Sequence, residues 1–159
     1  MKKPLSFFIL LTLCLCNFDG FCQNEEGNKK VVYRYFDEVV NQKKIEFLKD
    51  IYDENYLFTD LLSGGTNQGI KQLYDFLPYM FKAVPDIHFT VDIIVAENDM
   101  VVAECTATGT QKGEFFDIPA SGNKFDVKEI FIYTLKDGKI IANKGMLNLM
   151  GLQEQLKSK

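Results

Sequence analysis

One stretch near the end of the chain, residues 106–156, constrains the fold more than any other. Strand-like runs of alternating side chains fill most of it, and the Asp137-Gly138 pair separates two of them. An Asp-Gly pair between apolar runs is a strong hairpin signal. The stretch therefore predicts an antiparallel sheet that is followed by a short terminal helix. The predicted strands are 100–111, 125–135 and 139–145, and the predicted helix is 149–156.

The first half of the chain predicts helices. From Asn28 the apolar residues recur at spacings of three and four, which is typical of one face of a helix. A second short helix is expected over 43–52, and Thr66 is the expected N-cap of a third helix, which Pro78 should kink or restart. The first helical stripe consists of Val32, Tyr35, Phe36, Val39 and Val40.

Helices that precede a run of long strands indicate the α+β class. A short strand is expected at 55–60 and a longer one at 87–97. The longer strand is followed by the tight turn Asn98-Asp99. A curved sheet wrapped around the helices leaves a blind cone between them. Pockets commonly form in the mouth of such a cone.

The amino terminus resembles an export signal. A basic start precedes the apolar run 5–16, which has the length of a signal-peptide core and is too short to span a bilayer. Gly20 and Cys22 fit the small-residue positions of a cleavage site, which predicts a signal over 1–22, a loose polar segment over 23–27 and one domain over 28–157. The expected location is the periplasm or the exterior.

Two alternatives to cleavage stay open. Acylation of Cys16 or Cys22 would anchor the protein to lipid, although Leu15 and Phe21 are larger than the small residue such a site prefers. An uncleaved anchor is the other alternative.

Charge and cysteine content exclude several classes of function. Without residues 1–22 the chain has 16 basic and 21 acidic side chains, a net charge of −5, which argues against nucleic-acid binding. Only Cys105 remains outside the signal, so no disulfide framework is expected. The single histidine, His88, is expected on the surface. Neither a metal nor another cofactor is expected.

Several stretches together resemble the SnoaL-like polyketide cyclases of the nuclear transport factor 2-like superfamily. They are VVYRYFDEVVNQKKIEFLKDIYDENY, VPDIHFTVDIIVAENDMVVAECTATGTQKGEFFDIPASG, EIFIYTLKDGKI and GLQEQL. The resemblance covers residues 28–156 and implies a cone-shaped α+β barrel. It also implies an intramolecular aldol closure in which a carboxylate acts as general acid and base. Related domains serve as dehydratases, isomerases and non-catalytic ligand binders.

The chain departs from the family pattern at the expected catalytic positions. After GKI the family usually has Glu-His-Trp and then an aspartate, whereas this chain has Ala142-Asn143-Lys144, and Met146 or Asn148 falls at the aspartate. Gln111 stands where the second strand often ends in histidine, and Thr59 stands near another frequent histidine.

Glu129 and Asp60 are the remaining candidates for a catalytic acid or base. Glu129 lies on the same side of its predicted strand as Val127, Phe131 and Tyr133. It therefore enters the cone if that side of the strand points inward. The opposite face, which carries Lys128, also has apolar residues, so alternation leaves both orientations open. Asp60 ends a short strand, where it could line the mouth or form a turn.

Candidate ligand-binding residues are amides and aromatic side chains near the expected cavity. Gln111 or Asn148 could donate to a carbonyl oxygen, although Asn148 could instead cap the last helix. Glu104 lies in a polar stripe that is either inward or exposed, and Cys105 is expected to be a small buried apolar side chain. The ligand candidates are Gln111, Asn143, Asn148, Tyr35, Phe58 and Tyr74.

Three hypotheses for the function follow from these observations. The first is an exported cyclase or isomerase that acts on a small, largely apolar carbonyl compound. The second is a ligand-binding module that kept the cone and lost the acid–base residues. A structural role based on dimerisation is the third hypothesis, and a homodimer through the open face of the sheet is compatible with either of the first two.

Overall fold

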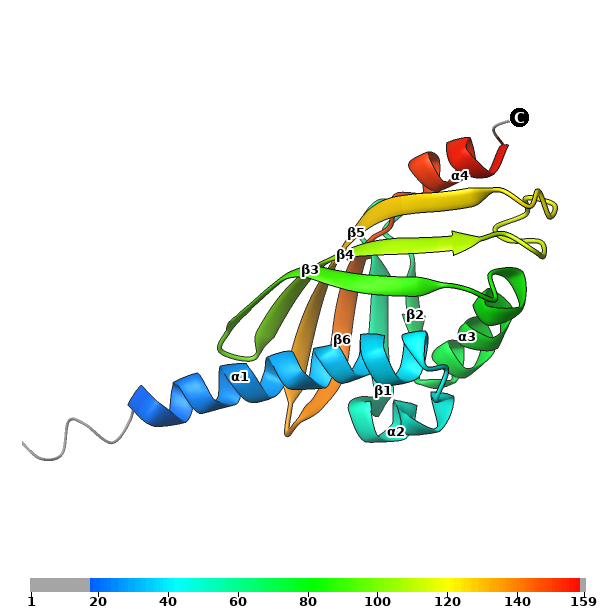
Figure 1. Cartoon of the computed structure of the whole chain (residues 1–159). Helices are drawn as coiled ribbons and strands as arrows, with labels where there is room; N and C mark the ends of the chain where they lie inside the picture. Colours follow the sequence, from blue (N-terminus) through cyan, green and yellow to red (C-terminus); the bar gives the residue numbers. More distant parts are fainter. Residues whose placement is uncertain (1–17, 158–159) are drawn as a thin grey trace, which may run out of the picture.

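The computed structural model describes residues 18–157, and Figure 1 shows a strongly curved sheet with helices packed against it. The chain first forms helices and then alternates between sheet and helix before the long strands. The elements are α1 (Phe18–Arg34), the π-helical continuation η1 (Tyr35–Asn41), the 3-10 turn η2 (Ile45–Phe47), α2 (Leu48–Ile51), β1 (Tyr52–Asp60), β2 (Thr66–Gln68), α3 (Lys71–Ala83), β3 (His88–Glu97), β4 (Met100–Thr110), β5 (Lys124–Lys136), β6 (Lys139–Met146) and α4 (Leu149–Lys157).

Six strands form one mixed sheet in the order β2-β1-β6-β5-β4-β3. Every neighbouring pair is antiparallel except β1 and β6, which are parallel. The predicted turn between β5 and β6 is present, because Asp137 and Gly138 both have positive φ (51° and 75°) as a type I′ turn requires. The α+β cone-shaped barrel expected from the sequence is confirmed.

The core lies between the concave side of the sheet and the helices. The predicted helical stripe is buried, with Val32 and Val39 fully inaccessible, and α1 and η1 pack against β3 and β4. α3 covers another part of the concave side, and α4 lies beside β5 (Figure 1). Each fully buried apolar side chain of this core contributes roughly 1.5–3 kcal/mol to the free energy of folding.

Two expectations about the third helix are wrong. Thr66 does not cap it, because Thr66–Gln68 pairs with β1 as a short strand and α3 begins at Lys71. Pro78 does not break it either, and α3 runs through that position without interruption. Leu77 and Met80 are buried on either side of the proline, so tertiary packing outweighs the loss of one helical hydrogen bond.

The segment 23–27, expected to be loose, is helical and belongs to α1. It is docked on the turn between β3 and β4, where Glu25 Oε1 accepts the Asn98 N–H (3.1 Å) and Asn28 Nδ2 donates to the Asn98 carbonyl (3.1 Å). These contacts explain why a polar end is ordered. Most of the predicted signal, residues 1–17, lies outside the described residues. Within the described part, no helix is long and apolar enough to cross a membrane.

Candidate functional site

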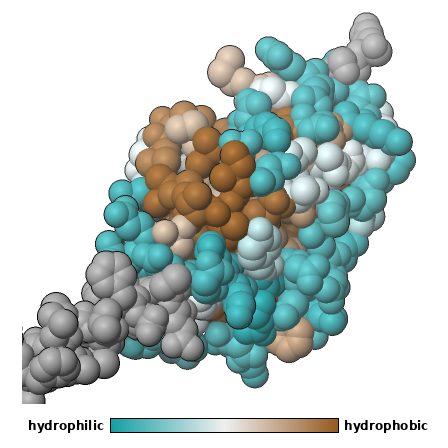
Figure 2. Space-filling view, turned by 60° about the vertical axis from the view of Figure 1, so that its left-hand side comes forward, coloured by the Kyte–Doolittle hydropathy of each residue, from teal (hydrophilic) through white to brown (hydrophobic). Residues whose placement is uncertain are grey.

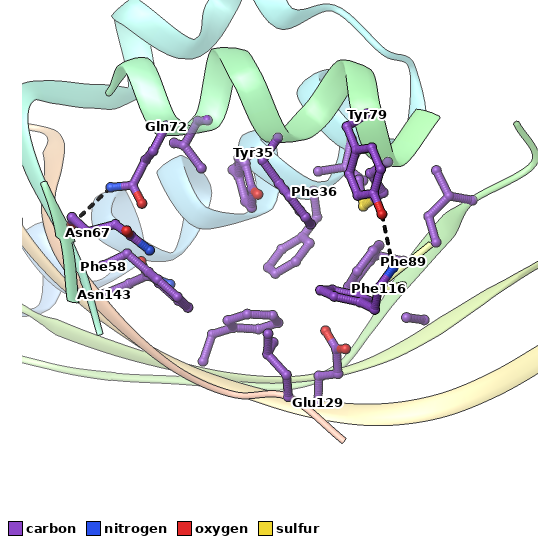
Figure 3. Close-up of a pocket in the computed structure, with 18 of the residues that line it drawn as sticks. Tyr35, Phe36, Phe58, Asn67, Gln72, Tyr79, Phe89, Phe116, Glu129 and Asn143 are labelled. Atoms are coloured by element: carbon purple, nitrogen blue, oxygen red, sulfur yellow. Dashed lines mark hydrogen bonds between the residues drawn. The ribbon is translucent and has the colours of Figure 1, made fainter. Parts of the chain in front are cut away.

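A cavity of about 580 Å³ lies between the concave face of the sheet and the helices (Figure 3). This volume falls within the range of pockets that hold small organic ligands, about 300–1,000 Å³. Half of the residues that line it are aromatic, so the cavity favours a flat apolar compound. The aromatic wall includes Tyr35, Phe36, Tyr52, Tyr56, Phe58, Phe89, Phe115, Phe116, Phe125, Phe131 and Tyr133.

Glu129 on β5 places a carboxyl group in this apolar wall. The face of β5 that carries Val127, Glu129, Phe131 and Tyr133 is the inner one, which settles the orientation that alternation left open. Its carboxyl group points into the open space of the cavity in Figure 3. Among the described residues, Glu129 has no hydrogen-bond or ion-pair partner.

Burial raises the pKa of the Glu129 carboxyl to about 7. At neutral pH the group is therefore present in both protonation states, which suits a group that both takes and returns a proton. Asp75 is the second carboxylate in the cavity wall. It is exposed and forms an ion pair with Lys71 (Nζ to Oδ2, 2.5 Å), so it belongs to the solvated rim.

Cys105 lies directly opposite Glu129 on β4. Burial raises the pKa of its thiol to about 12, so the thiol stays protonated and unreactive at neutral pH. It is fully inaccessible to solvent. The interpretation of Cys105 as a small buried apolar side chain is confirmed.

Tyrosine hydroxyls and one amide gather at another part of the wall. Tyr56 donates a hydrogen bond to Asn143 Oδ1, and both residues are buried. Tyr35 and Tyr52 pack edge to face, with their ring centroids 5.2 Å apart. Burial raises the pKa values of Tyr35, Tyr52, Tyr56 and Tyr133, so these hydroxyls keep their protons and serve as hydrogen-bond donors.

An aromatic loop between β4 and β5 covers part of the cavity. Phe115 and Ile118 pair across a tight turn in which Phe116 and Asp117 both have positive φ (48° and 59°). The Phe116 N–H donates to the Tyr79 hydroxyl oxygen (2.9 Å), which links the loop to α3 (Figure 3). The sequence analysis did not single out this loop. Its signal was the Phe115-Phe116 pair in a segment rich in turn-forming residues.

The sequence of this chain matches a known protein family over most of its length. The profile of the SnoaL-like polyketide cyclases matches residues 30–156. The chain belongs to this family. A search of curated proteins found no match.

Several solved structures have a similar fold. A SnoaL-like polyketide cyclase from Jannaschia sp. CCS1 is 26% identical, with 85% of this chain and 94% of that chain covered and a TM-score of 0.78. TsrD from Streptomyces laurentii is 25% identical, with 84% and 97% covered and a TM-score of 0.75. A polyketide cyclase from Bacillus cereus ATCC 10987 is 25% identical, with 82% and 80% covered and a TM-score of 0.68.

The residues at the usual aspartate position of SnoaL-like cyclases do not enter the cavity. Met146 pairs with Ile130 on the outer face of the sheet and is exposed. Asn148 caps α4 by accepting the Gly151 N–H (3.0 Å), which was one of the two expected roles. Of the two carboxylates in the cavity wall, Glu129 on the neighbouring strand β5 is the one that lies among apolar side chains, whereas Asp75 belongs to the solvated rim.

Four of the eight candidate site residues line the cavity together, namely Glu129, Asn143, Tyr35 and Phe58. The other four, Asp60, Gln111, Asn148 and Tyr74, are not part of its wall. Tyr74 packs against the core from α3 instead.

Asp60 is a turn residue rather than a cavity acid. Its carboxylate accepts the Leu62 N–H (3.0 Å) and the Ser63 hydroxyl hydrogen. These hydrogen bonds, that from Ser63 first, lower the pKa of Asp60 below its ordinary value. An ionised surface carboxylate with a lowered pKa is a poor general base at neutral pH.

Gln111 supports the cavity indirectly. It is fully buried, donates to the Ile118 carbonyl (2.8 Å) and accepts from the Ser121 hydroxyl (2.6 Å). These bonds hold the loop that carries Phe115 and Phe116. Gln111 is thus a positioning residue for the loop and does not face a ligand.

The polar stripe of β4 lies on the outer face of the sheet. Glu104 pairs there with Lys128 (Oε1 to Nζ, 3.5 Å), and Thr106 donates to Asp92 (2.6 Å). His88 is exposed, as expected. None of these residues contributes to the cavity.

Proposed function

We propose that this SnoaL-like protein is an acid–base catalyst, a cyclase or isomerase, for a small and largely apolar carbonyl compound. The observation that carries the proposal is the unpaired Glu129 carboxyl in an aromatic cavity, where its pKa is about 7. A carboxylate in apolar surroundings is a stronger base than one in water, and a positioned base accelerates proton transfer by about 10²–10⁴.

The reaction would begin with proton abstraction next to the carbonyl group. Ionised Glu129 takes the proton from carbon, and the electron pair of the C–H bond moves to the carbonyl oxygen, which gives an enolate. In an isomerase, protonated Glu129 returns the proton to a different carbon. In a cyclase, the enolate carbon attacks a second carbonyl carbon of the same molecule, and the new alkoxide takes the proton.

Exchange of deuterium into 2-tetralone tests this proposal. In D₂O, removal of a proton next to the carbonyl and return of deuterium lowers the ¹H NMR signal of that position. We expect catalysed exchange that rises with pH around an apparent pKa of about 7 and falls by about 10²–10⁴ in Glu129→Gln. Glu104→Gln removes a carboxylate from the outer face of the neighbouring strand and is the matched control. Full activity in Glu129→Gln would contradict the proposed mechanism.

The alternative function is that of a ligand-binding module without catalysis. It is favoured by the loss of the histidine and aspartate positions that the family resemblance predicts. Binding of 2-tetralone without catalysed exchange would support this alternative. Native mass spectrometry of the protein from its own compartment gives a second test, because a co-purified compound would identify the ligand class.

We also propose a homodimer through the outer face of the sheet. Large apolar side chains on this face are exposed, including Ile93 and Val95 (each 55%), Ile130 and Met146, and the strand register places Ile130 beside Met146. Figure 2 shows a continuous hydrophobic area on the molecular surface. Monomers seldom expose large apolar patches. Sedimentation equilibrium should give a dimer that Ile93→Lys dissociates, and a monomeric wild type would refute the assignment.

We further propose export through residues 1–22. The intact mass of the protein recovered from its natural host distinguishes the alternatives. Cleavage gives a chain that begins at Gln23, whereas acylation adds the mass of lipid to a chain that begins at Cys16 or Cys22. A mass equal to that of the full chain would refute export with cleavage.

A further inference from the structure

The hydroxyl group of Tyr133 is buried without a hydrogen-bond partner. Tyr133 is fully inaccessible to solvent, and among the described residues its oxygen is the one buried side-chain polar atom that lacks a partner. Leaving a buried donor unpaired costs free energy, so buried polar groups are almost always satisfied. Tyr133 also belongs to the cavity wall, so a ligand in the cavity supplies the missing partner once the side chains that cover the hydroxyl shift slightly.

Asn143 supplies a second donor at the same place. It pairs with Tyr133 in the register of β5 and β6, so the two side chains leave the sheet side by side on its inner face. Its Oδ1 atom accepts the hydrogen bond from Tyr56, which fixes the orientation of the amide. Its Nδ2 atom donates no hydrogen bond to the described residues, and unlike the Tyr133 oxygen it is not sealed from the cavity. Both donors therefore lack an acceptor within the described protein.

The two donors lie away from Glu129. Tyr133 lies four positions after Glu129 on β5, and a strand advances about 3.3 Å per residue, so the two Cα atoms are about 13 Å apart. Phe131 lies between them on the same face and lines the cavity. Contacts at Tyr133 and at Glu129 thus reach different ends of one ligand.

We propose that the Tyr133 hydroxyl and the Asn143 amide form a hydrogen-bonding subsite for an oxygen acceptor of the ligand, such as a carbonyl, at the end remote from Glu129. A carbonyl oxygen has two lone pairs and can accept from both donors. The aromatic side chains between the subsite and Glu129 would hold the flat apolar body of the ligand. Tyr133 and Asn143 are then positioning residues, and the inference rests on the proposed function only in that the ligand occupies the same cavity.

Binding of 9-fluorenone and of fluorene tests this subsite. The two compounds have the same fused-ring frame, but only 9-fluorenone carries a carbonyl oxygen. We expect wild type to bind 9-fluorenone more tightly in equilibrium dialysis. Tyr133→Phe should weaken 9-fluorenone binding by about 5- to 10-fold and leave fluorene binding unchanged, because it removes one hydrogen bond and keeps the ring.

The controls separate a ligand contact from a structural role. Tyr33→Phe removes an exposed hydroxyl from α1 and should change neither affinity. Without ligand, Tyr133→Phe should unfold at a higher temperature than wild type, because it removes an unsatisfied buried group. A structural hydroxyl would give the opposite change.

Three results would overturn the subsite. They are a wild-type protein with no preference for 9-fluorenone, an equal loss of affinity for both compounds in Tyr133→Phe, and a loss for neither. Because 9-fluorenone has no proton next to its carbonyl for Glu129 to remove, failure of the exchange assay with 2-tetralone does not affect the outcome. The subsite and the proposed catalysis can therefore fail independently.

Discussion

Replacement of Glu129 by glutamine should stabilise the protein at neutral pH and have little effect in acid. In the folded protein the pKa of Glu129 is raised from 4.5 to about 7, because burial disfavours the charged form. The folded state therefore holds its proton more tightly than the unfolded state. The wild-type protein loses stability as pH rises from about 4.5 to about 7, and the loss is constant above that range.

The size of the effect follows from the two pKa values. A tenfold change in proton affinity corresponds to 1.36 kcal/mol, so the rise to about 7 is equivalent to roughly 3 kcal/mol. This figure is an upper value, because Glu129 lines a cavity that water can enter. Glutamine has nearly the shape of the protonated acid and carries no charge. The variant should thus lack the destabilisation at high pH.

Urea unfolding at a series of pH values from 4 to 8.5 measures this difference. The free energy of unfolding of Glu129→Gln should match that of wild type near pH 4 and exceed it by up to about 3 kcal/mol above pH 7.5. Glu104→Gln should stay within about 0.5 kcal/mol of wild type, since Glu104 is part of an exposed ion pair. A difference between Glu129→Gln and wild type that does not change with pH would refute the burial of this carboxyl group.

Three further predictions concern the packing and the secondary structure. Cys105 should react with a thiol reagent only as fast as the protein unfolds, since its thiol is buried with a pKa of about 12; rapid labelling of the native protein would contradict this. Gly109→Ala should lower the unfolding free energy by about 1–3 kcal/mol, because its Cβ would come within 2.3 Å of Val84 Cγ1, and thermal unfolding measures the change. Asn148→Ala should cost about 1 kcal/mol through loss of the cap of α4, and an unchanged melting temperature would contradict the cap.

Much of the fold could be predicted because its signals are local. The periodicity around Val32, the alternation along β5 and the Asp137-Gly138 turn each depend on neighbouring residues, and the structure agrees with all three. The failures at Thr66 and Pro78 have the opposite origin. Strand pairing with β1 in one case and burial of the flanking side chains in the other decided the outcome, and both involve residues distant in sequence.

The candidate site could be predicted only in part for the same reason. Glu129 was a candidate on residue type and parity, yet both faces of β5 carry apolar side chains, so its burial was open. Asp60 and Gln111 have the right chemistry, but their hydrogen bonds to nearby turn residues direct them away from the cavity. The aromatic pair Phe115-Phe116 belongs to a loop, and loop conformation follows little from local sequence preference.

By itself, the sequence determined the α+β class, the family resemblance and the departure from the usual acid–base residues, because these depend on residue identity and short-range spacing. Only the tertiary structure decided which face of β5 is inside. That choice places Glu129 in an aromatic wall, where burial raises the pKa of its carboxyl group. It also places the unpaired hydroxyl of Tyr133 beside Asn143. Burial arises from long-range packing of the sheet against the helices, so no local pattern along the chain encodes it.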